Sequence, residues 1–210
     1  MTPNEPDYAD FASRDKVEST LDRLQEVYGS GHRFAIYSTE FGYKTDPPYP
    51  GGASFDTASA YLNWTEYLTW RDPRIRSFDQ FQLTDPPADS GSAFDTGLET
   101  YDNPPKEKPT YAAFRMPIWL PHRTFSSGHT IEVWGCVRPQ RFVERPAPAE
   151  IQFRGSGQQT FGTVARIHPR DRYGYFDVAR PFPGSGTIRL RWVYPDGTEI
   201  FSRYVRITGQ

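Results

Sequence analysis

One carboxylate stands at a position where barrel enzymes often carry a catalytic group. Glu40 ends the apolar run 34–40, which lies between Gly31 and Gly42. A short apolar run between glycines is typical of a buried parallel strand, and the C-terminal ends of such strands form the active sites of barrel enzymes. An ionised carboxylate there can attack an anomeric carbon and form a glycosyl-enzyme intermediate. Capping of the turn after the strand is an alternative role for Glu40, and the spacing alone favours neither.

Four further polar residues would line the same cleft. A second strand is expected over 75–84, and alternation along it puts Gln80 and Gln82 on one face. If that face meets a substrate, the two amides can hydrogen-bond its hydroxyl groups. Asp85 follows at the end of this strand, and Tyr43 lies just beyond the first strand. Packing as buried amides or loop residues is the alternative for each of the four.

The sequence does not indicate other kinds of reaction centre. The four histidines have no metal-ligand spacing, and there is neither a glycine-rich phosphate loop nor a Gly-x-Ser-x-Gly motif. The single cysteine, Cys136, excludes an intramolecular disulfide. We therefore expect no metal site and no cofactor.

The elements that must position these residues follow the order helix, strand, helix, strand. Apolar residues recur at three- and four-residue spacing over 13–28 and again over 55–70, which predicts two helices. Their alternation with the two strands is typical of a parallel α/β sheet. A long loop over 85–109 and a short helix over 110–116 are expected to follow.

The periodicity changes from helical to two-residue after residue 122. Apolar and charged residues then alternate clearly in one segment, where Ile188, Leu190 and Trp192 lie between Arg189 and Arg191. About six or seven short strands follow one another in this region, which predicts an immunoglobulin-like β-sandwich.

The balance of charge changes at the same place. Residues 1–122 hold 11 Lys and Arg against 19 Asp and Glu, a balance of −8, and residues 123–210 hold 13 Arg against 7 Asp and Glu, a balance of +6, which together give the net charge of −2. We therefore place a domain boundary between residues 122 and 123.

The near-neutral total argues against a nucleic acid or a membrane surface as partner. No apolar run is long enough to span a membrane, and the N-terminus lacks the features of a signal peptide.

Four arginines are expected on the strands of the sandwich: Arg189, Arg191, Arg203 and Arg206. Two interpretations stay open for them. They form either a solvated strand face or a basic surface that docks an acidic neighbouring module or an acidic glycan.

Several segments together resemble a known enzyme family. Residues 36–43, 45–48 and 78–85 resemble the last two strands of clan-A (β/α)8 glycoside hydrolases, cellulase-like enzymes of actinobacterial type. Residues 94–98 and 108–114 resemble the passage that closes such barrels. The resemblance implies an α/β plus all-β fold: a partial (β/α)8 barrel, with its last two strands and helices, followed by the immunoglobulin-like β-sandwich.

The resemblance also implies a retaining mechanism with Glu40 as the nucleophile. Such a mechanism needs a second carboxylate about 5–5.5 Å away, which in this family ends strand four, usually within Asn-Glu-Pro. The chain contains Asn4, Glu5 and Pro6 in that order, but only one helix is expected between Glu5 and Glu40, so we interpret the match as a coincidence. The general acid/base and six barrel strands therefore have no counterpart in this chain.

These observations predict the C-terminal portion of a secreted-type glycoside hydrolase that acts on a polysaccharide or oligosaccharide. As a lone chain we expect it to be inactive, and its partner would be the missing N-terminal part of the barrel. By family resemblance the enzyme would be extracellular. Two alternatives stay open: a non-catalytic carbohydrate-binding or adhesion module, and the product of a decaying gene that does not fold stably.

Overall fold

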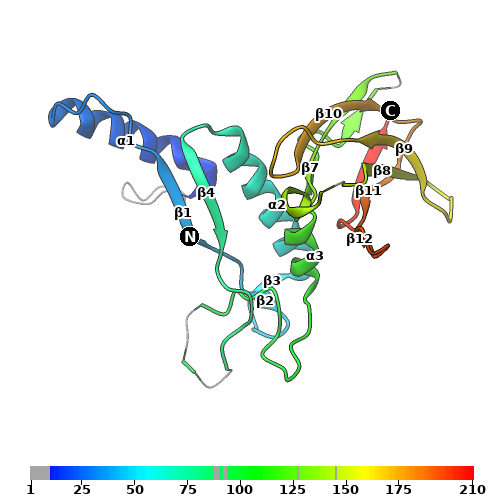
Figure 1. The fold of residues 1–210 in the computed structure, drawn as a ribbon, viewed down its shortest axis with the longest axis horizontal. Coiled ribbons are helices and arrows are strands. Elements are labelled where there is room, and N and C mark those ends of the chain that lie inside the picture. Colours follow the sequence, from blue (N-terminus) through cyan, green and yellow to red (C-terminus); the bar gives the residue numbers. More distant parts are fainter. Residues whose placement is uncertain (1–9, 88–89, 92–93, 127, 145) are drawn as a thin grey trace.

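The computed structural model describes residues 10–87, 90–91, 94–126, 128–144 and 146–210. The Asn-Glu-Pro sequence at residues 4–6 lies outside the described residues. In Figure 1 a central helix joins three regions: an arm, a lobe of loops and a β-sandwich. No helix among the described residues is long and apolar enough to span a membrane.

The arm contains helix α1 (Arg14–Val27) and two parallel strands, β1 (Ile36–Phe41) and β4 (Ile75–Gln80). A short 3-10 turn (Phe11–Ser13) precedes α1, and the Asp10 carboxylate accepts a hydrogen bond from the backbone N–H of Ser13 at 2.9 Å. Such a cap satisfies one of the free N–H groups at a helix start. Each of the three main elements lies within about two to four residues of its predicted position.

The central helix is α2 (Phe55–Arg71), and it ends before Asp72 and Pro73 because a residue that precedes proline avoids the helical conformation. The Ser54 hydroxyl caps its first turn by accepting from the N–H of Thr57 at 3.3 Å. Eight residues of α2 are buried. The helix therefore packs on several sides, against α3 (Pro109–Arg115), against β4 and against the sandwich.

A lobe of loops extends from the N-terminal end of α2 (Figure 1). Two short parallel strands lie at its top, β2 (Thr45–Asp46) and β3 (Ala53–Ser54). The rest of the lobe is the long connection from β4 to α3, which carries the bridge between Thr84 and Glu99.

The sandwich consists of two sheets. The smaller sheet has the order β10–β7–β5, and its strands are β5 (Ile118–Trp119), β7 (Thr130–Cys136) and β10 (Tyr175–Pro181). The larger sheet has the order β6–β13–β11–β8–β9, with β12 also paired to β11. Its strands are β6 (Thr124–Phe125), β8 (Ala149–Gly155), β9 (Gly162–Ile167), β11 (Gly186–Val193), β12 (Glu199–Phe201) and β13 (Val205–Gly209). A 3-10 turn (Gln140–Phe142) lies between β7 and β8.

The main hydrophobic core lies between these two sheets. The alternation predicted for β11 is confirmed, because Ile188, Leu190 and Trp192 are fully buried while Arg189 and Arg191 lie on the outer face. Alternate residues of a strand point to opposite faces, so one side of β11 joins the core and the other meets solvent.

A buried network fastens α2 to the smaller sheet. The Glu66 carboxylate, fully buried, forms an ion pair with Arg138 and accepts a hydrogen bond from the Tyr175 hydroxyl at 2.8 Å. The Tyr175 ring stacks on Trp134, and the Tyr67 ring meets the edge of that indole. These contacts join the helix and the sandwich through buried groups. The second Glu66 carboxylate oxygen and the Trp134 indole N–H are also buried, and they have no hydrogen-bond partner among the described residues.

A second buried link lies closer to α3. The Asn63 side chain donates to the Ala113 carbonyl at 2.8 Å and accepts from the Ile118 N–H at 3.1 Å and from the Arg203 Nε at 3.0 Å. One amide therefore ties α2 to α3, to β5 and to the segment before β13.

The prediction of a partial (β/α)8 barrel is wrong. In the described part of the chain the parallel sheet of the arm has two strands, and most of the remaining structure is antiparallel β with three α-helices in all. The β-sandwich is confirmed, and its smaller sheet includes β5, which lies before residue 122. The order helix, strand, helix, strand was read correctly, but it does not build a barrel here.

Candidate functional site

The parallel sheet of the arm is unusually open. No residue of β1 or β4, both of which are fully described, is buried. Within the described residues each strand pairs only with the other, so each has one free edge. Parallel sheets are normally covered on both faces and read as buried apolar strands. This sheet therefore has less cover than parallel sheets normally have.

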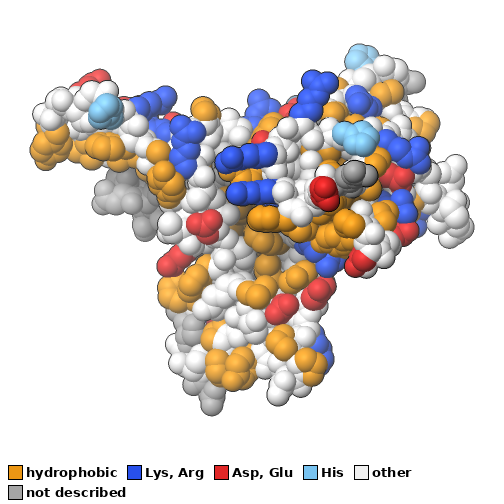
Figure 2. Space-filling view, viewed as in Figure 1, with side chains coloured by type: hydrophobic (Ala, Val, Ile, Leu, Met, Phe, Trp, Pro, Cys, Tyr) orange, Lys and Arg blue, Asp and Glu red, His pale blue; other side chains and the backbone are white. Residues whose placement is uncertain are grey.

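Large apolar side chains are exposed along the arm. Tyr37 on β1 is 63% exposed, and Val27 and Tyr28 at the end of α1 are 72% and 81% exposed. Figure 2 shows hydrophobic side chains gathered along one side of the arm. Contiguous exposed apolar surface of this kind commonly marks a site of protein–protein contact.

An aromatic cavity lies where the arm meets α2. Its volume is about 300 Å³, and its lining includes Phe11, Phe41, Tyr43 and Trp64. The Phe41 ring contacts Phe11 at 5.3 Å and Tyr43 at 5.3 Å, both edge to face. The rings make the base of the arm rigid and leave a recess beside the open sheet.

Glu40 is exposed near the end of β1. The register shifts between Ser38, which pairs with Phe78, and Phe41, which pairs with Gln80, so β1 has one extra residue there. The bulge turns Phe41 toward α2, where its ring lies 4.9 Å from Phe78. The assignment of Glu40 as a catalytic group remains a prediction.

Tyr43 and Gln80 lie together at the end of the sheet, where both line a small cavity with Leu62 and Thr96. The Gln80 amide donates to the Thr96 carbonyl at 2.8 Å and so holds the loop after β4 against the strand. The Gln82 side-chain oxygen is buried and has no hydrogen-bond partner among the described residues. Such a buried acceptor is uncommon in folded proteins.

Asp85 lies in the lobe, away from the open face of the sheet, and is buried together with Lys108. Its carboxylate forms an ion pair with the Lys108 ammonium at 2.5 Å and accepts from the Gly97 N–H at 2.8 Å. These contacts hold the two ends of the long loop together. The structure thus gives Asp85 a clear structural partner that the sequence did not reveal.

Two more charged groups surround this pair. Asp95 forms an ion pair with Lys44 at 3.1 Å, and the Tyr49 ring lies under the ammonium groups of both lysines, 5.8 Å from Lys44 and 5.9 Å from Lys108. Burial, together with the carboxylates of Asp85 and Asp95, raises the pKa of the Tyr49 hydroxyl to about 12. The phenol therefore stays neutral and serves as a hydrogen-bond donor at ordinary pH.

The predicted site residues therefore do not form one cluster. Tyr43 and Gln80 line one small cavity at the end of the arm sheet, and Glu40 is exposed on β1 and does not line it. Asp85 belongs to the buried charges of the lobe. Sequence reasoning missed Lys108, since a single lysine in a proline-rich loop carries no pattern that indicates burial. Within the described residues, no group of three His, Cys, Asp or Glu side chains is placed to hold a metal ion.

Comparisons with known proteins give a different picture from the resemblance in the sequence. No protein family matches the chain, and no curated protein matches it. Solved structures that match include a putative superoxide reductase from Thermotoga maritima, with 13% identity, 45% of this chain and 85% of that chain covered, and a TM-score of 0.36. Superoxide reductase (neelaredoxin) from Ignicoccus hospitalis matches with 13% identity, coverage of 45% and 80%, and a TM-score of 0.38. The sulfur carrier protein SoxY from Chlorobium limicola f thiosulfatophilum matches with 11% identity, coverage of 46% and 79%, and a TM-score of 0.30.

The glycoside hydrolase prediction is wrong. The described residues form a two-stranded parallel sheet and a β-sandwich instead of a (β/α)8 barrel. The matching structures named above are superoxide reductase and sulfur carrier proteins. The alternative of a carbohydrate-binding module is not supported either. The low identities and TM-scores do not transfer the activity of these proteins to this chain.

Proposed function

We propose that this chain is one part of a larger protein assembly, in which its arm binds a polypeptide that adds parallel strands to the β1–β4 sheet. The observation that carries the proposal is the exposure of both strands, neither of which has a buried residue. A parallel sheet that is only partly covered, and whose outer edges have no partner strand among the described residues, is incomplete as a folding unit.

The free edges of the two strands determine how the partner would bind. Each outer edge of a strand presents a row of backbone N–H and C=O groups, and an added strand binds through them. Proteins usually protect such edges with proline, lysine or a covering loop. Neither β1 nor β4 contains a proline or a lysine, and their charged residues are Glu40 on β1 and Arg76 and Asp79 on β4. The edges are thus left in a form that accepts another strand.

Exposed apolar side chains would supply most of the binding energy. Full burial of one large apolar side chain contributes about 1.5–3 kcal/mol, and Tyr37, Val27 and Tyr28 are each more than half exposed. A partner strand beside β1 would cover the Tyr37 ring, and a partner element beside α1 would cover the other two.

The rest of the chain would hold the arm in place. Helix α2 packs against β4 and also carries Glu66 and Asn63, which bind the sandwich through buried contacts. The sandwich has its own core. It would therefore act as the stable support from which the arm presents its sheet.

Hydrogen–deuterium exchange on the isolated chain tests the incomplete sheet. We expect amides of β1 and β4 to exchange at least about a hundredfold faster than amides of β8 and β11, because local stability follows buried contact. Equal protection of the four strands would overturn the proposal, since the sheet would then be complete without a partner.

The partner itself is tested with the polypeptide encoded directly upstream of this chain, produced together with it. We expect a stable complex on size-exclusion chromatography with light scattering, and slower exchange of β1 and β4 amides within it. Tyr37→Glu should abolish the complex, because a charge would be buried at the new strand contact. Phe142→Glu is the matched control, since Phe142 is exposed on the sandwich. A complex that resists Tyr37→Glu, or its absence with the upstream polypeptide, would contradict this choice of partner.

A further inference from the structure

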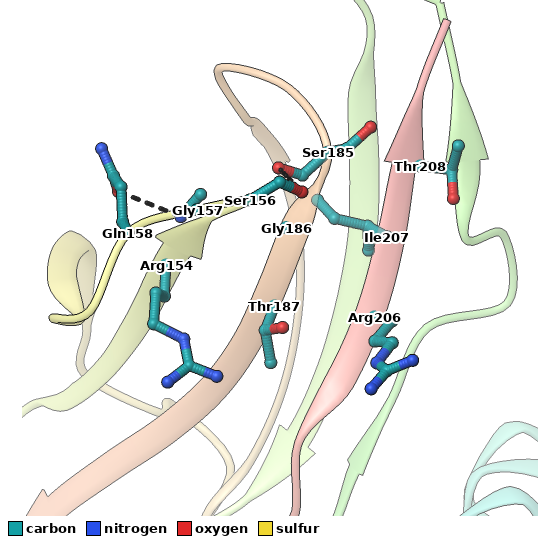
Figure 3. Close-up of a pocket in the computed structure, with 11 residues that line it drawn as sticks. Arg154, Ser156, Gly157, Gln158, Ser185, Gly186, Thr187, Arg206, Ile207 and Thr208 are labelled. Atoms are coloured by element: carbon teal, nitrogen blue, oxygen red, sulfur yellow. Dashed lines mark hydrogen bonds between the residues drawn. The ribbon is translucent and has the colours of Figure 1, made fainter.

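A groove crosses the outer face of the larger sheet, on the opposite side from the sandwich core. It has a volume of 410 Å³ and lies over the ends of β8, β11 and β13. Figure 3 shows the side chains of Arg154 and Arg206 on either side of Thr187. No residue of the lining is acidic: it consists of Arg154, Gly155, Ser156, Gly157, Gln158, Ser185, Gly186, Thr187, Arg206, Ile207 and Thr208.

The register of the strands fixes this arrangement. Thr187 on β11 pairs with Arg154 on β8 and with Arg206 on β13, so the three residues form one row across the sheet. Neighbouring strands lie about 4.8 Å apart, which puts the two arginines about 10 Å apart at the backbone. Arg189 lies two residues farther along β11 on the same face.

These arginines differ from others on the same face in having no acidic partner. Arg191 forms ion pairs with Glu150 and Glu199, and Arg166 forms one with Glu150. In the part of the chain that the structure describes, Arg154, Arg189 and Arg206 form no ion pair. Positive charge without a compensating carboxylate therefore gathers at the groove end of the face.

Aromatic rings hold two of the guanidinium groups in position. The guanidinium of Arg154 lies 4.8 Å from the centre of the Phe161 ring, and that of Arg189 lies 4.1 Å from it. The Phe161 ring also stacks on Tyr204. Arg189 also lies over Phe201 at 4.1 Å. Stacking restricts these long side chains, so less conformational entropy is lost when they bind a ligand.

We propose that this groove binds an acidic peptide segment with two carboxylates three residues apart. In an extended left-handed segment, residues i and i+3 lie on the same side and about 9 Å apart, which matches the spacing of the two arginine positions. Each guanidinium can take one carboxylate in a two-pronged contact, and the hydroxyl groups of Ser156, Thr187 and Thr208 lie between or beside them. This site is independent of the arm and of its proposed partner.

Binding is measured with the peptide Gly-Glu-Pro-Pro-Glu-Gly, in which the two prolines favour the extended form. We expect shifts of amide signals in β8, β11 and β13 in NMR titrations, with a dissociation constant on the order of 1 mM or below. The uncharged peptide Gly-Gln-Pro-Pro-Gln-Gly should give no shifts. Equal binding of both peptides would overturn the proposal.

Variants separate the site from general charge attraction. Arg154→Gln with Arg206→Gln should weaken binding at least about tenfold, because two charge-assisted contacts are lost. Arg166→Gln removes one charge from the same face and should change binding by less than about twofold. An equal loss in both variants, or competition by inorganic sulfate at the concentration of the peptide itself, would show a simple anion surface and contradict peptide recognition. Circular dichroism of each variant shows whether the sandwich is folded.

Discussion

Glu66 and Arg138 form an ion pair between the central helix and the sandwich, and the Tyr175 hydroxyl donates to the same Glu66 oxygen at 2.8 Å. Glu66 is completely buried. A carboxylate in this position depends on its partners, because an isolated buried charge is strongly unfavourable. The joint between α2 and the sandwich is thus held by charge as well as by packing.

Arg138→Met should destabilise the chain by about 3 kcal/mol, since it leaves the Glu66 carboxylate buried without its cation. Urea unfolding followed by circular dichroism measures this loss. The double variant Glu66→Leu with Arg138→Met should lose less than the sum of its single variants, because no charge is then left unpaired. Arg166→Met is the control, since that arginine is 64% exposed in its side chain and its pair with Glu150 contributes less than about 1 kcal/mol.

Lys108→Met should lower the free energy of unfolding by a similar amount, about 3 kcal/mol, because Asp85 would remain buried beside an apolar side chain. Glu40→Gln should change it by less than about 0.5 kcal/mol, since Glu40 is exposed. The same unfolding experiment compares the two. Equal effects of both substitutions would contradict the different environments that the structure gives these carboxylates.

The local elements could be read from the sequence because their signals are local. The helical spacing over 13–28 and 55–70 corresponds to α1 and α2, and the alternation around Trp192 corresponds to β11. In each case one apolar face is enough to specify the element. The β-sandwich followed from several such strands together.

The barrel and the candidate site could not be read in the same way. Two strands and two helices in the right order have the local pattern of a barrel, but closure depends on partner strands that local periodicity does not specify. The bulge at Glu40 and the ion pair of Asp85 with Lys108 also depend on contacts between residues far apart in the sequence. The sequence contains both residues of the pair, and nothing in their spacing indicates that they meet.

Stability should fall at alkaline pH, in part through Tyr49. The pKa of its hydroxyl is raised from 10 to about 12 by burial and by the carboxylates of Asp85 and Asp95. Between these two values the unfolded state has lost the proton and the folded state retains it, so the free energy of unfolding decreases as pH rises. Tyr49→Phe should make this decrease shallower. Urea unfolding at about pH 9 and about pH 11 compares the two proteins, and an unchanged pH dependence in the variant would contradict the assignment.

The thiol of Cys136 should report on the opening of the sandwich. Cys136 lies on β7, the central strand of the smaller sheet, and burial raises the pKa of its thiol. The thiol donates to the Tyr173 carbonyl at 3.4 Å. Thiol reagents attack the thiolate, so the folded protein should react with a disulfide reagent at least about a thousandfold more slowly than the urea-unfolded chain. Arg138→Met should raise the rate in the folded state, because the joint beside β7 is weakened, whereas Arg166→Met should leave it unchanged. Fast reaction of the native protein would mean that the smaller sheet opens readily, and the Glu66–Arg138 pair would then not hold the joint.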